Sequence, residues 1–177
     1  MIIRDLVEAD VPAITAIYNQ LIAETDVIWL EEPVSVEDRI AWLRSLRAAD
    51  AALAAVADDG TVVGYAAIFE FRSKAGYWPT VELTIMLDDR HRGSGAGQAL
   101  MDELIARARE AGRRVVVAGI DGGNDGSIRF HQRNGFVEVA RMPGVGSKHG
   151  RPLDLVLMQL ALPPADPQDD TPHDPSP

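Results

Sequence analysis

Three glycines fall within five residues at positions 93–97, in the stretch RGSGAG, directly before a pattern typical of a helix. In such a turn the backbone N–H groups point outward, the glycines let a ligand approach the main chain, and the helix dipole favours negative charge. A phosphorylated ligand is therefore predicted here. A Walker loop would end in Gly-Lys-Ser/Thr, and a dinucleotide fingerprint would start directly after a strand, where DRHR intervenes. A glycine-rich loop without a ligand is the alternative.

A carboxylate is the second candidate for chemistry. Glu82 lies in TVELTI, just before the glycine stretch, and its apolar neighbours can raise the pKa of its side chain into the range useful for a general base. A strand glutamate that faces outward and has no chemical role is the alternative.

The elements that must position these groups follow from hydrophobic periodicity and turn signals. Strands are predicted at 2–4, 51–57, 61–70, 80–87, 114–120, 136–142 and 153–160. Helices are predicted from Asp10, from Ser35 with Asp38 as an imperfect capping box, after the glycine stretch as far as Gly112, and from Ser127 to about Asn134. Helices alternate with strands only in the second half, so we expect a mixed α+β sheet and not a doubly wound one.

Length and composition predict one domain over residues 1–162. The chain has 177 residues, of which 46% are hydrophobic and 25% charged, as in ordinary globular proteins. Residues 163–177 are rich in proline and aspartate and contain no core-forming residues, so we expect a disordered acidic tail.

The charge balance and the missing cysteines narrow the function. A formal net charge of −10 argues against binding to nucleic acid or to anionic membranes. No cysteine is present, so a thiolate nucleophile and a zinc-thiolate site are excluded, and we expect no metal. The start MIIRDLVEAD has no apolar signal core, and no run is long enough to span a membrane, so we expect a cytoplasmic protein.

The residues around the glycine stretch resemble one enzyme family. RGSGAG is similar to the pyrophosphate loop, Arg/Gln-x-x-Gly-x-Gly/Ala, of the GNAT acyltransferase superfamily. Four further stretches resemble its branch of phosphinothricin and methionine sulfoximine N-acetyltransferases: IYNQLIAETDVIWLEEPVSVEDRIAWL, FRSKAGYWPTVE, VAGIDGGNDGSIRFHQRNGFVEV and GSKHGRPLDLVLMQL. The resemblance covers residues 2–160 in the expected order.

The resemblance implies a GNAT fold, a mixed and mostly antiparallel sheet that is splayed near the coenzyme and has helices on both faces, with acetyl-CoA as co-substrate. Glu82 would be the general base, directly or through water. His131 stands where many members have the tyrosine that protonates the thiolate, and a structural histidine is the alternative. The implied coenzyme contacts are Thr84, Ile85, Met86, Arg92, Gly93, Ser94, Gly95, Ala96, Gly97 and Asn124, the first three through the main chain.

The resemblance also implies an acceptor pocket and a homodimer. The implied pocket residues are Phe71, Arg72, Ser73, Val81, Glu82 and Leu83, and Trp29 and Tyr77 are candidate wall or core residues. Arg72 can bind a carboxylate through two parallel hydrogen bonds. Lys74, Lys148 and Arg151 are further candidates for that task, with a solvated surface position as the alternative. Leu83, Met86 and Pro152 depart from the branch, which often has histidine, an aromatic residue and tryptophan there.

The predicted function is transfer of an acetyl group from acetyl-CoA to the α-amine of a small amino acid or analogue. The substrates predicted are phosphinothricin, methionine sulfoximine and methionine sulfone, and direct attack in a ternary complex is expected because the chain has no cysteine to carry the acetyl group. One alternative is the same chemistry on a protein N-terminus, a polyamine or an aminoglycoside. The other is a non-catalytic acyl-CoA sensor, against which the presence of Glu82 argues.

Overall fold

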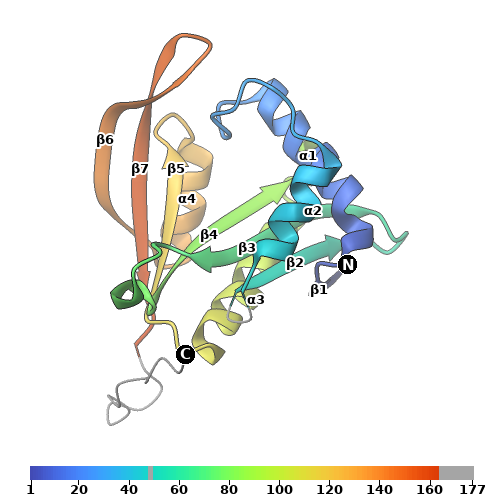
Figure 1. Cartoon of the computed structure of the whole chain (residues 1–177), viewed down its shortest axis with the longest axis horizontal. Coiled ribbons are helices and arrows are strands. Elements are labelled where there is room, and N and C mark those ends of the chain that lie inside the picture. The colour runs from blue at the N-terminus through green and yellow to red at the C-terminus, as the bar shows by residue number, and fades with distance from the viewer. Residues whose placement is uncertain (48–49, 164–177) are drawn as a thin grey trace.

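A single seven-stranded sheet, in the order β1-β2-β3-β4-β5-β7-β6, organises the computed structural model, which describes residues 1–47 and 50–163 (Figure 1). The strands are β1 (Ile2–Asp5), β2 (Ala51–Val56), β3 (Val62–Glu70), β4 (Thr80–Leu87), β5 (Val115–Asp121), β6 (Val137–Lys148) and β7 (Arg151–Ala161). The helices are α1 (Val11–Glu24), α2 (Val36–Ser45), α3 (Ala96–Glu110) and α4 (Asp125–Arg133), with 3-10 turns η1 (Glu8–Asp10), η2 (Ala75–Tyr77) and η3 (Asp89–His91). Only β4 and β5 are parallel neighbours within this described sheet, which confirms the predicted mixed, mostly antiparallel arrangement.

Helices cover both faces of the sheet. On one face, Leu100 and Leu104 of α3 and Ile128 of α4 belong to the largest buried cluster, together with apolar residues of β2 to β5 and β7. On the other face, Ile14 of α1 packs with Tyr65 of β3, and Trp42 of α2 lies against them. We name the two faces after these helices, the α3 face and the α1 face. Strand side chains alternate between them, so a strand residue that packs in one cluster has its chain neighbours on the other face.

The sheet opens between β4 and β5. Their pairing ends at Leu83 and Ala118, whereas β4 stays paired with β3 as far as Leu87. Figure 1 shows the two strands diverging beyond this point, with β4 directed toward α1. Within the described residues, the edge of β4 that faced β5 therefore has no strand partner from Thr84 onward, as the predicted splay requires.

Local sequence signals account for several element boundaries. Asp59 accepts the backbone N–H of Thr61 at 3.0 Å in the turn between β2 and β3, which confirms the predicted hairpin. Ser35 Oγ accepts the N–H of Asp38 at 3.0 Å, and Asp38 Oδ2 accepts the N–H of Ser35 at 3.2 Å. The capping box is therefore complete, with aspartate in the place of the usual glutamate.

The predicted start of the fourth helix is wrong. Asn124, not Ser127, is the N-cap of α4, because Asn124 Oδ1 accepts the backbone N–H of Ser127 at 3.0 Å. β6 is also longer than predicted, since register shifts near Ala140 and between Met142 and Gly146 carry it to Lys148.

The C-terminal part of the described chain ends just beyond β7. Of the predicted tail, residues 164–177 lie outside the described residues. In the described ranges, none of the helices combines the length and the apolar character needed to cross a bilayer.

Candidate active site

The glycine stretch forms the turn that opens α3. Gly93 and Gly95 have φ angles of 79° and 89°, in the left-handed region that glycine adopts without steric cost, and Gly95 is the N-cap of α3. The first N–H groups of a helix have no partner within it, so those of Gly97 and Gln98 are directed out of the N-terminus. Arg92 adds a positive charge beside the turn, where it pairs with Asp89. The turn is thus suited to an anionic group, as predicted.

Asp88 supports this turn and was not singled out from the sequence. It lies at the end of β4 and is 6% exposed. Its Oδ1 accepts the backbone N–H of Arg90 at 2.9 Å, and its Oδ2 pairs with Arg90 Nη2 at 2.6 Å. The hydrogen bonds from the Arg90 side chain lower the pKa of Asp88 to about 2. Aspartate side chains often accept the backbone N–H two residues further on and so start a turn, which makes Asp88 a turn signal that is visible in the sequence.

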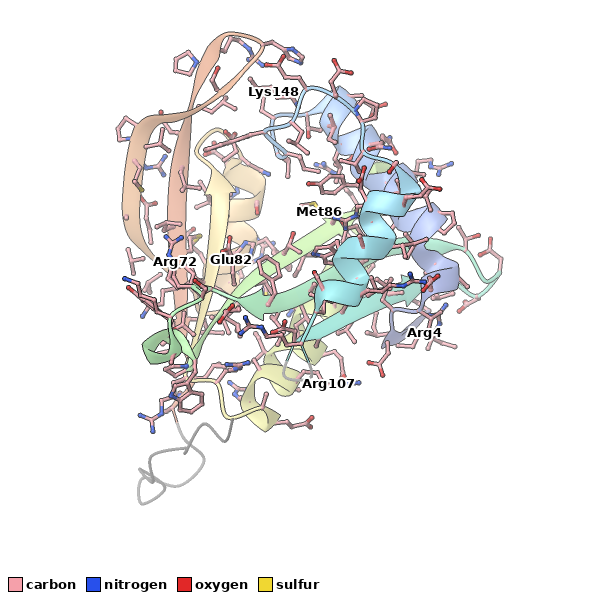
Figure 2. All side chains as sticks on the ribbon, viewed as in Figure 1. Arg4, Arg72, Glu82, Met86, Arg107 and Lys148 are labelled. Carbon is pink, nitrogen blue, oxygen red and sulfur yellow. The ribbon has the colours of Figure 1, made fainter. Side chains whose placement is uncertain are left out.

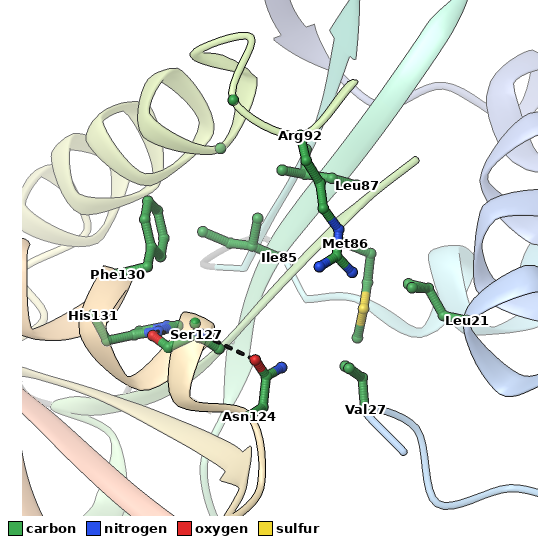
Figure 3. A pocket seen from close by; sticks show the side chains of 13 residues that line it. Leu21, Val27, Ile85, Met86, Leu87, Arg92, Asn124, Ser127, Phe130 and His131 are labelled. Carbon is green, nitrogen blue, oxygen red and sulfur yellow. Dashed lines mark hydrogen bonds between the residues drawn. The ribbon is translucent and has the colours of Figure 1, made fainter. Parts of the chain in front are cut away.

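A cavity of about 340 Å³ occupies the opening between β4 and α4. Figure 3 shows Ile85, Leu87 and Phe130 along one side and Met86, Leu21 and Val27 along the other. It is lined by Leu21, Val27, Ile85, Met86, Leu87, Arg92, Gly93, Gly97, Asn124, Gly126, Ser127, Phe130 and His131. The cavity therefore joins the N-terminus of α3 to the unpaired edge of β4.

Six of the ten predicted coenzyme residues line this cavity, and four do not. Ile85, Met86, Arg92, Gly93, Gly97 and Asn124 are on its surface. Thr84, Ser94, Gly95 and Ala96 are not, and the side chain of Ala96 is fully buried. Leu21 and Val27 line the cavity although no sequence signal marked them, because they come from α1 and the loop after it.

Asn124 stabilises a helix with its side-chain oxygen and leaves its side-chain N–H groups available to a ligand. Its Oδ1 caps α4 through Ser127 (dashed in Figure 3), and among the described residues its Nδ2 has no hydrogen-bond partner. The residue therefore caps α4 and also offers a donor to a ligand in the cavity.

Glu82 lies on the α1 face of β4, at the point where the sheet begins to open. A Cβ built on Gly119 of β5 would lie 3.8 Å from Glu82 Oε1 and 3.5 Å from Leu155 Cδ1 of β7, so the carboxylate projects over an exposed glycine. Burial raises the pKa of Glu82, and the positive charge of Arg72 partly offsets that rise. The predicted perturbation of the carboxylate thus has a structural cause.

Arg72 and Phe71 lie near Glu82, at the end of β3. Figure 2 shows Arg72 and Glu82 at the same end of the sheet, and their charge interaction agrees with that placement. The Arg72 guanidinium carbon is 4.8 Å from the centre of the Phe71 ring, and this ring meets the ring of Tyr77 edge to face at 6.0 Å. Arg72 and Ser73 are exposed, so both are accessible from solvent.

Two predicted acceptor residues direct their side chains away from Glu82. Val81 and Leu83 are 0% and 5% exposed and belong to the core cluster on the α3 face. Alternation along β4 requires this, because their neighbour Glu82 faces α1. Contact between an acceptor and either residue is therefore confined to the main chain.

His131 is a buried member of the cavity lining. It is 6% exposed, its ring meets those of Phe130 and Phe136 edge to face, and its Nδ1 is 2.8 Å from the carbonyl oxygen of Ser127. Because a carbonyl only accepts, Nδ1 carries a hydrogen and Nε2 of the neutral ring does not. Burial lowers the pKa of His131, which favours this neutral form over the imidazolium needed to donate a proton. Its role as an acid stays a prediction.

Comparison with known proteins places this arrangement in a family. Residues 14–136 match the Acetyltransferase (GNAT) family, a span that runs from α1 through the glycine turn to the end of α4. The chain belongs to this family. The GNAT fold and the acetyltransferase class expected from the resemblance are therefore both confirmed.

Three relatives of this GNAT chain show the range of names within the family. It is 45% identical to the L-methionine sulfoximine/L-methionine sulfone acetyltransferase of Pseudomonas aeruginosa, over 92% of this chain and 95% of that protein. The solved phosphinothricin acetyltransferase of Sinorhizobium meliloti, in complex with acetyl-CoA, is 34% identical with a TM-score of 0.87, covering 91% and 88%. The solved ribosomal-protein-alanine N-acetyltransferase of Brucella melitensis is 42% identical with a TM-score of 0.88, covering 92% and 100%.

Metal ligands do not cluster in the described part of the chain. In residues 1–47 and 50–163, no group of three or more His, Asp or Glu side chains is arranged to hold a metal ion.

Proposed function

We propose that this protein transfers the acetyl group of acetyl-CoA to the α-amine of a small amino acid or analogue, in a ternary complex. The acceptors proposed are methionine sulfoximine, methionine sulfone and phosphinothricin, which the names of two relatives support. The observation that carries the proposal is the position of Glu82, a half-buried carboxylate with a raised pKa at the start of the opening between β4 and β5.

The cavity and the turn before α3 suit a coenzyme of this kind. The N-terminus of α3, with Arg92 beside it, offers N–H groups and positive charge for a pyrophosphate. The unpaired edge of β4 from Thr84 to Met86 offers main-chain groups to an amide-containing arm, and Asn124 Nδ2 faces the same cavity. Bound acetyl-CoA would supply the thioester whose carbonyl carbon is attacked.

The side chains near Glu82 would bind and deprotonate the acceptor. Arg72 would hold the carboxylate of an amino acid by two-point hydrogen bonding. Glu82 would accept the proton of the attacking amine, either directly or through a water molecule, as a new C–N bond forms and the C–S bond breaks. The departing thiolate takes up one proton, for which His131 remains the predicted donor.

Two alternatives remain for the acceptor and for turnover. The ribosomal-protein-alanine relative favours a peptide that begins with alanine as a second acceptor class. A sensor that binds acyl-CoA without turnover would need the cavity but not Glu82.

A homodimer is part of the proposal. β6 is an edge strand of twelve residues in the described sheet, and it exposes Val137, Val139, Met142 and Val145 at 41–60%. An exposed apolar edge of this length favours contact with a second copy. Light scattering after size exclusion would distinguish a dimer from a monomer. The cytoplasmic location stays a prediction of the sequence.

Thiol release from acetyl-CoA tests the function directly. We expect turnover with methionine sulfoximine, methionine sulfone or phosphinothricin, and little with a peptide that begins with alanine, a polyamine or an aminoglycoside. Turnover of the peptide alone would favour the second acceptor class. Binding of coenzyme A without turnover of any amine would favour the sensor.

A further inference from the structure

Lys148 is a charged side chain that the proposed reaction does not use, and it is neither on the surface nor available to an acceptor carboxylate, the two alternatives that the sequence left open. It is 1% exposed, at the end of β6. Its Nζ donates to the main-chain carbonyl oxygens of Ile22, Thr25 and Ile28 at 2.6, 2.6 and 3.0 Å. A lysine ammonium has three donors, so these bonds use all of them. A buried charge without hydrogen bonds would be costly, which marks this contact as a specific one.

The three carbonyls belong to the end of α1 and to the segment that follows it. Thr25 is the C-cap of α1, and the last carbonyls of a helix lack partners within it and attract a cation. Lys148 reaches them from more than 100 residues later in the chain. It thereby ties the tip of the β6–β7 hairpin to residues 25–31, which we term the wall segment (Figure 2).

Other contacts join the same two pieces. A Cβ built on Gly146 of β6 would overlap the Trp29 ring, so the indole packs directly on this glycine. The backbone N–H of His149 donates to Glu31 Oε1 at 2.7 Å. Arg151 pairs with Asp26 at 2.9 Å on the exposed surface. Of these contacts, the Lys148 bonds are the most buried.

The wall segment borders both parts of the site. Val27 lines the coenzyme cavity with Met86. Trp29 packs on Gly146, which pairs with Leu153 of β7. Two residues further along β7, Leu155 lies beside Gly119, and Glu82 lies beside the same glycine. The segment therefore extends from the cavity toward the carboxylate on the acceptor side.

We propose that Lys148 is a positioning residue for the acceptor, because it holds the wall segment so that Trp29 closes the acceptor side of the site. The inference rests on the proposed function. The buried Trp29 indole N–H has no hydrogen-bond partner among the described residues. Packing on Gly146 therefore positions the ring, and Lys148 fixes the main chain next to it through the carbonyl of Ile28. The turn before α3 follows η3, which Asp88 caps, and the Lys148 bonds end on residues 22–28, away from that turn.

Lys148→Met is the first test, since methionine keeps an unbranched apolar stem and removes the three donors. We expect the KM for the acceptor to rise about tenfold as Trp29 shifts, and the KM for acetyl-CoA to rise clearly less, since the wall segment contributes only Val27 to that cavity. Arg151→Met is the matched control. It removes a cation that joins the same two pieces at the surface, where such pairs contribute little, so both KM values should stay within about twofold.

Gly146→Ala tests the same wall without touching Lys148, and it decides the matter if Lys148→Met does not fold. The added methyl group must displace the Trp29 ring, and the same rise confined to the acceptor KM is expected. A folded Lys148→Met or Gly146→Ala protein with an unchanged acceptor KM would overturn the inference, as would an equal rise in both KM values. Wild-type turnover is measured first: its absence overturns the proposed function and this inference together, whereas wild-type turnover with an unchanged variant overturns the inference alone.

Discussion

The two halves of the candidate site are built in different ways. The coenzyme half consists largely of main chain: the turn at 92–97, the unpaired edge of β4 and the N-terminus of α4 all lie within residues 84–131. The acceptor half consists of side chains. Glu82 and Arg72 come from the sheet and the loop beside it, and the wall proposed for the acceptor, Trp29, packs on Gly146 from the other end of the chain.

This difference determines how each half responds to substitution. A main-chain site depends on backbone geometry, so it tolerates most side-chain changes and is sensitive to residues that permit unusual φ angles. A side-chain site loses its function with the group itself. Leu83 and Met86, which differ from the residues common in the branch, fall under different parts of this rule. The side chain of Leu83 points into the core, whereas that of Met86 lines the cavity.

The largest effect is expected for Glu82→Gln, which removes the proposed base and keeps the shape of the side chain. The kcat should fall by about 10²- to 10⁴-fold, the usual contribution of general base catalysis, while the affinity for coenzyme A stays unchanged. Stopped assays of thiol release and calorimetric titration of coenzyme A would measure the two quantities. A kcat within threefold of the wild type would show that Glu82 is not the base, and the acceptor half would then not depend on this side chain.

The pH dependence gives this prediction a second readout. Burial raises the pKa of Glu82, and a base must be ionised, so kcat/KM should rise with pH through a pKa above that of ordinary glutamate. This rise of kcat/KM with pH should be absent in Glu82→Gln. A raised folded-state pKa also means that folding stability falls as pH rises through that range, so Glu82→Gln should melt at a higher temperature than the wild type at pH 7.

A smaller effect, confined to the acceptor half, is expected for Arg72→Gln. Loss of hydrogen bonds to a carboxylate should raise the KM for the acceptor by about 10- to 100-fold and leave the KM for acetyl-CoA unchanged. The guanidinium lowers the pKa of Glu82, so its removal should also move the ascending limb of kcat/KM to higher pH. Arg47→Gln, which removes a neighbouring surface cation paired with Glu70, is the control and should change neither quantity.

Gly95→Ala should affect the coenzyme half alone. Alanine at a φ of 89° costs about 1 kcal/mol, so we expect the KM for acetyl-CoA to rise about fivefold as the turn relaxes. Gly112→Ala is the matched control. It introduces comparable strain, at a φ of 69°, beyond the other end of α3, and it should lower the melting temperature without changing this KM. Equal effects of both variants on the KM would show that the turn at 92–97 has no special role.

The smallest expected effect separates the two tasks of Asn124. Asn124→Ala should destabilise the protein by about 1 kcal/mol, because the cap on Ser127 is lost, and should weaken binding of coenzyme A. Asn124→Asp keeps a good cap but replaces the amide donor by a carboxylate. Its unfolding free energy should match that of the wild type while coenzyme A binds more weakly. Unchanged binding in Asn124→Asp would leave Asn124 as a cap only.

Much of the fold could be predicted because its signals are local. Ser35 with Asp38 marks a helix start, Asp59 marks a hairpin, and the glycines at 93 and 95 mark a turn that needs positive φ angles. Prediction failed where two local signals compete. Ser127 and Asn124 are both good caps, and the backbone after β5 selects Asn124.

The sequence by itself determined most helices and strands, the glycine turn at 92–97 and the place of Glu82 on the strand before it, because each depends on residues close together along the chain. Only the tertiary structure decided which way each side chain faces and which distant residues meet. Val81 and Leu83 turn into the core because the pleat of β4 places Glu82 on the opposite face. Leu21 and Val27 reach the cavity, and Lys148 is buried against α1, because the packing of α1 and of the β6–β7 hairpin joins segments more than 100 residues apart.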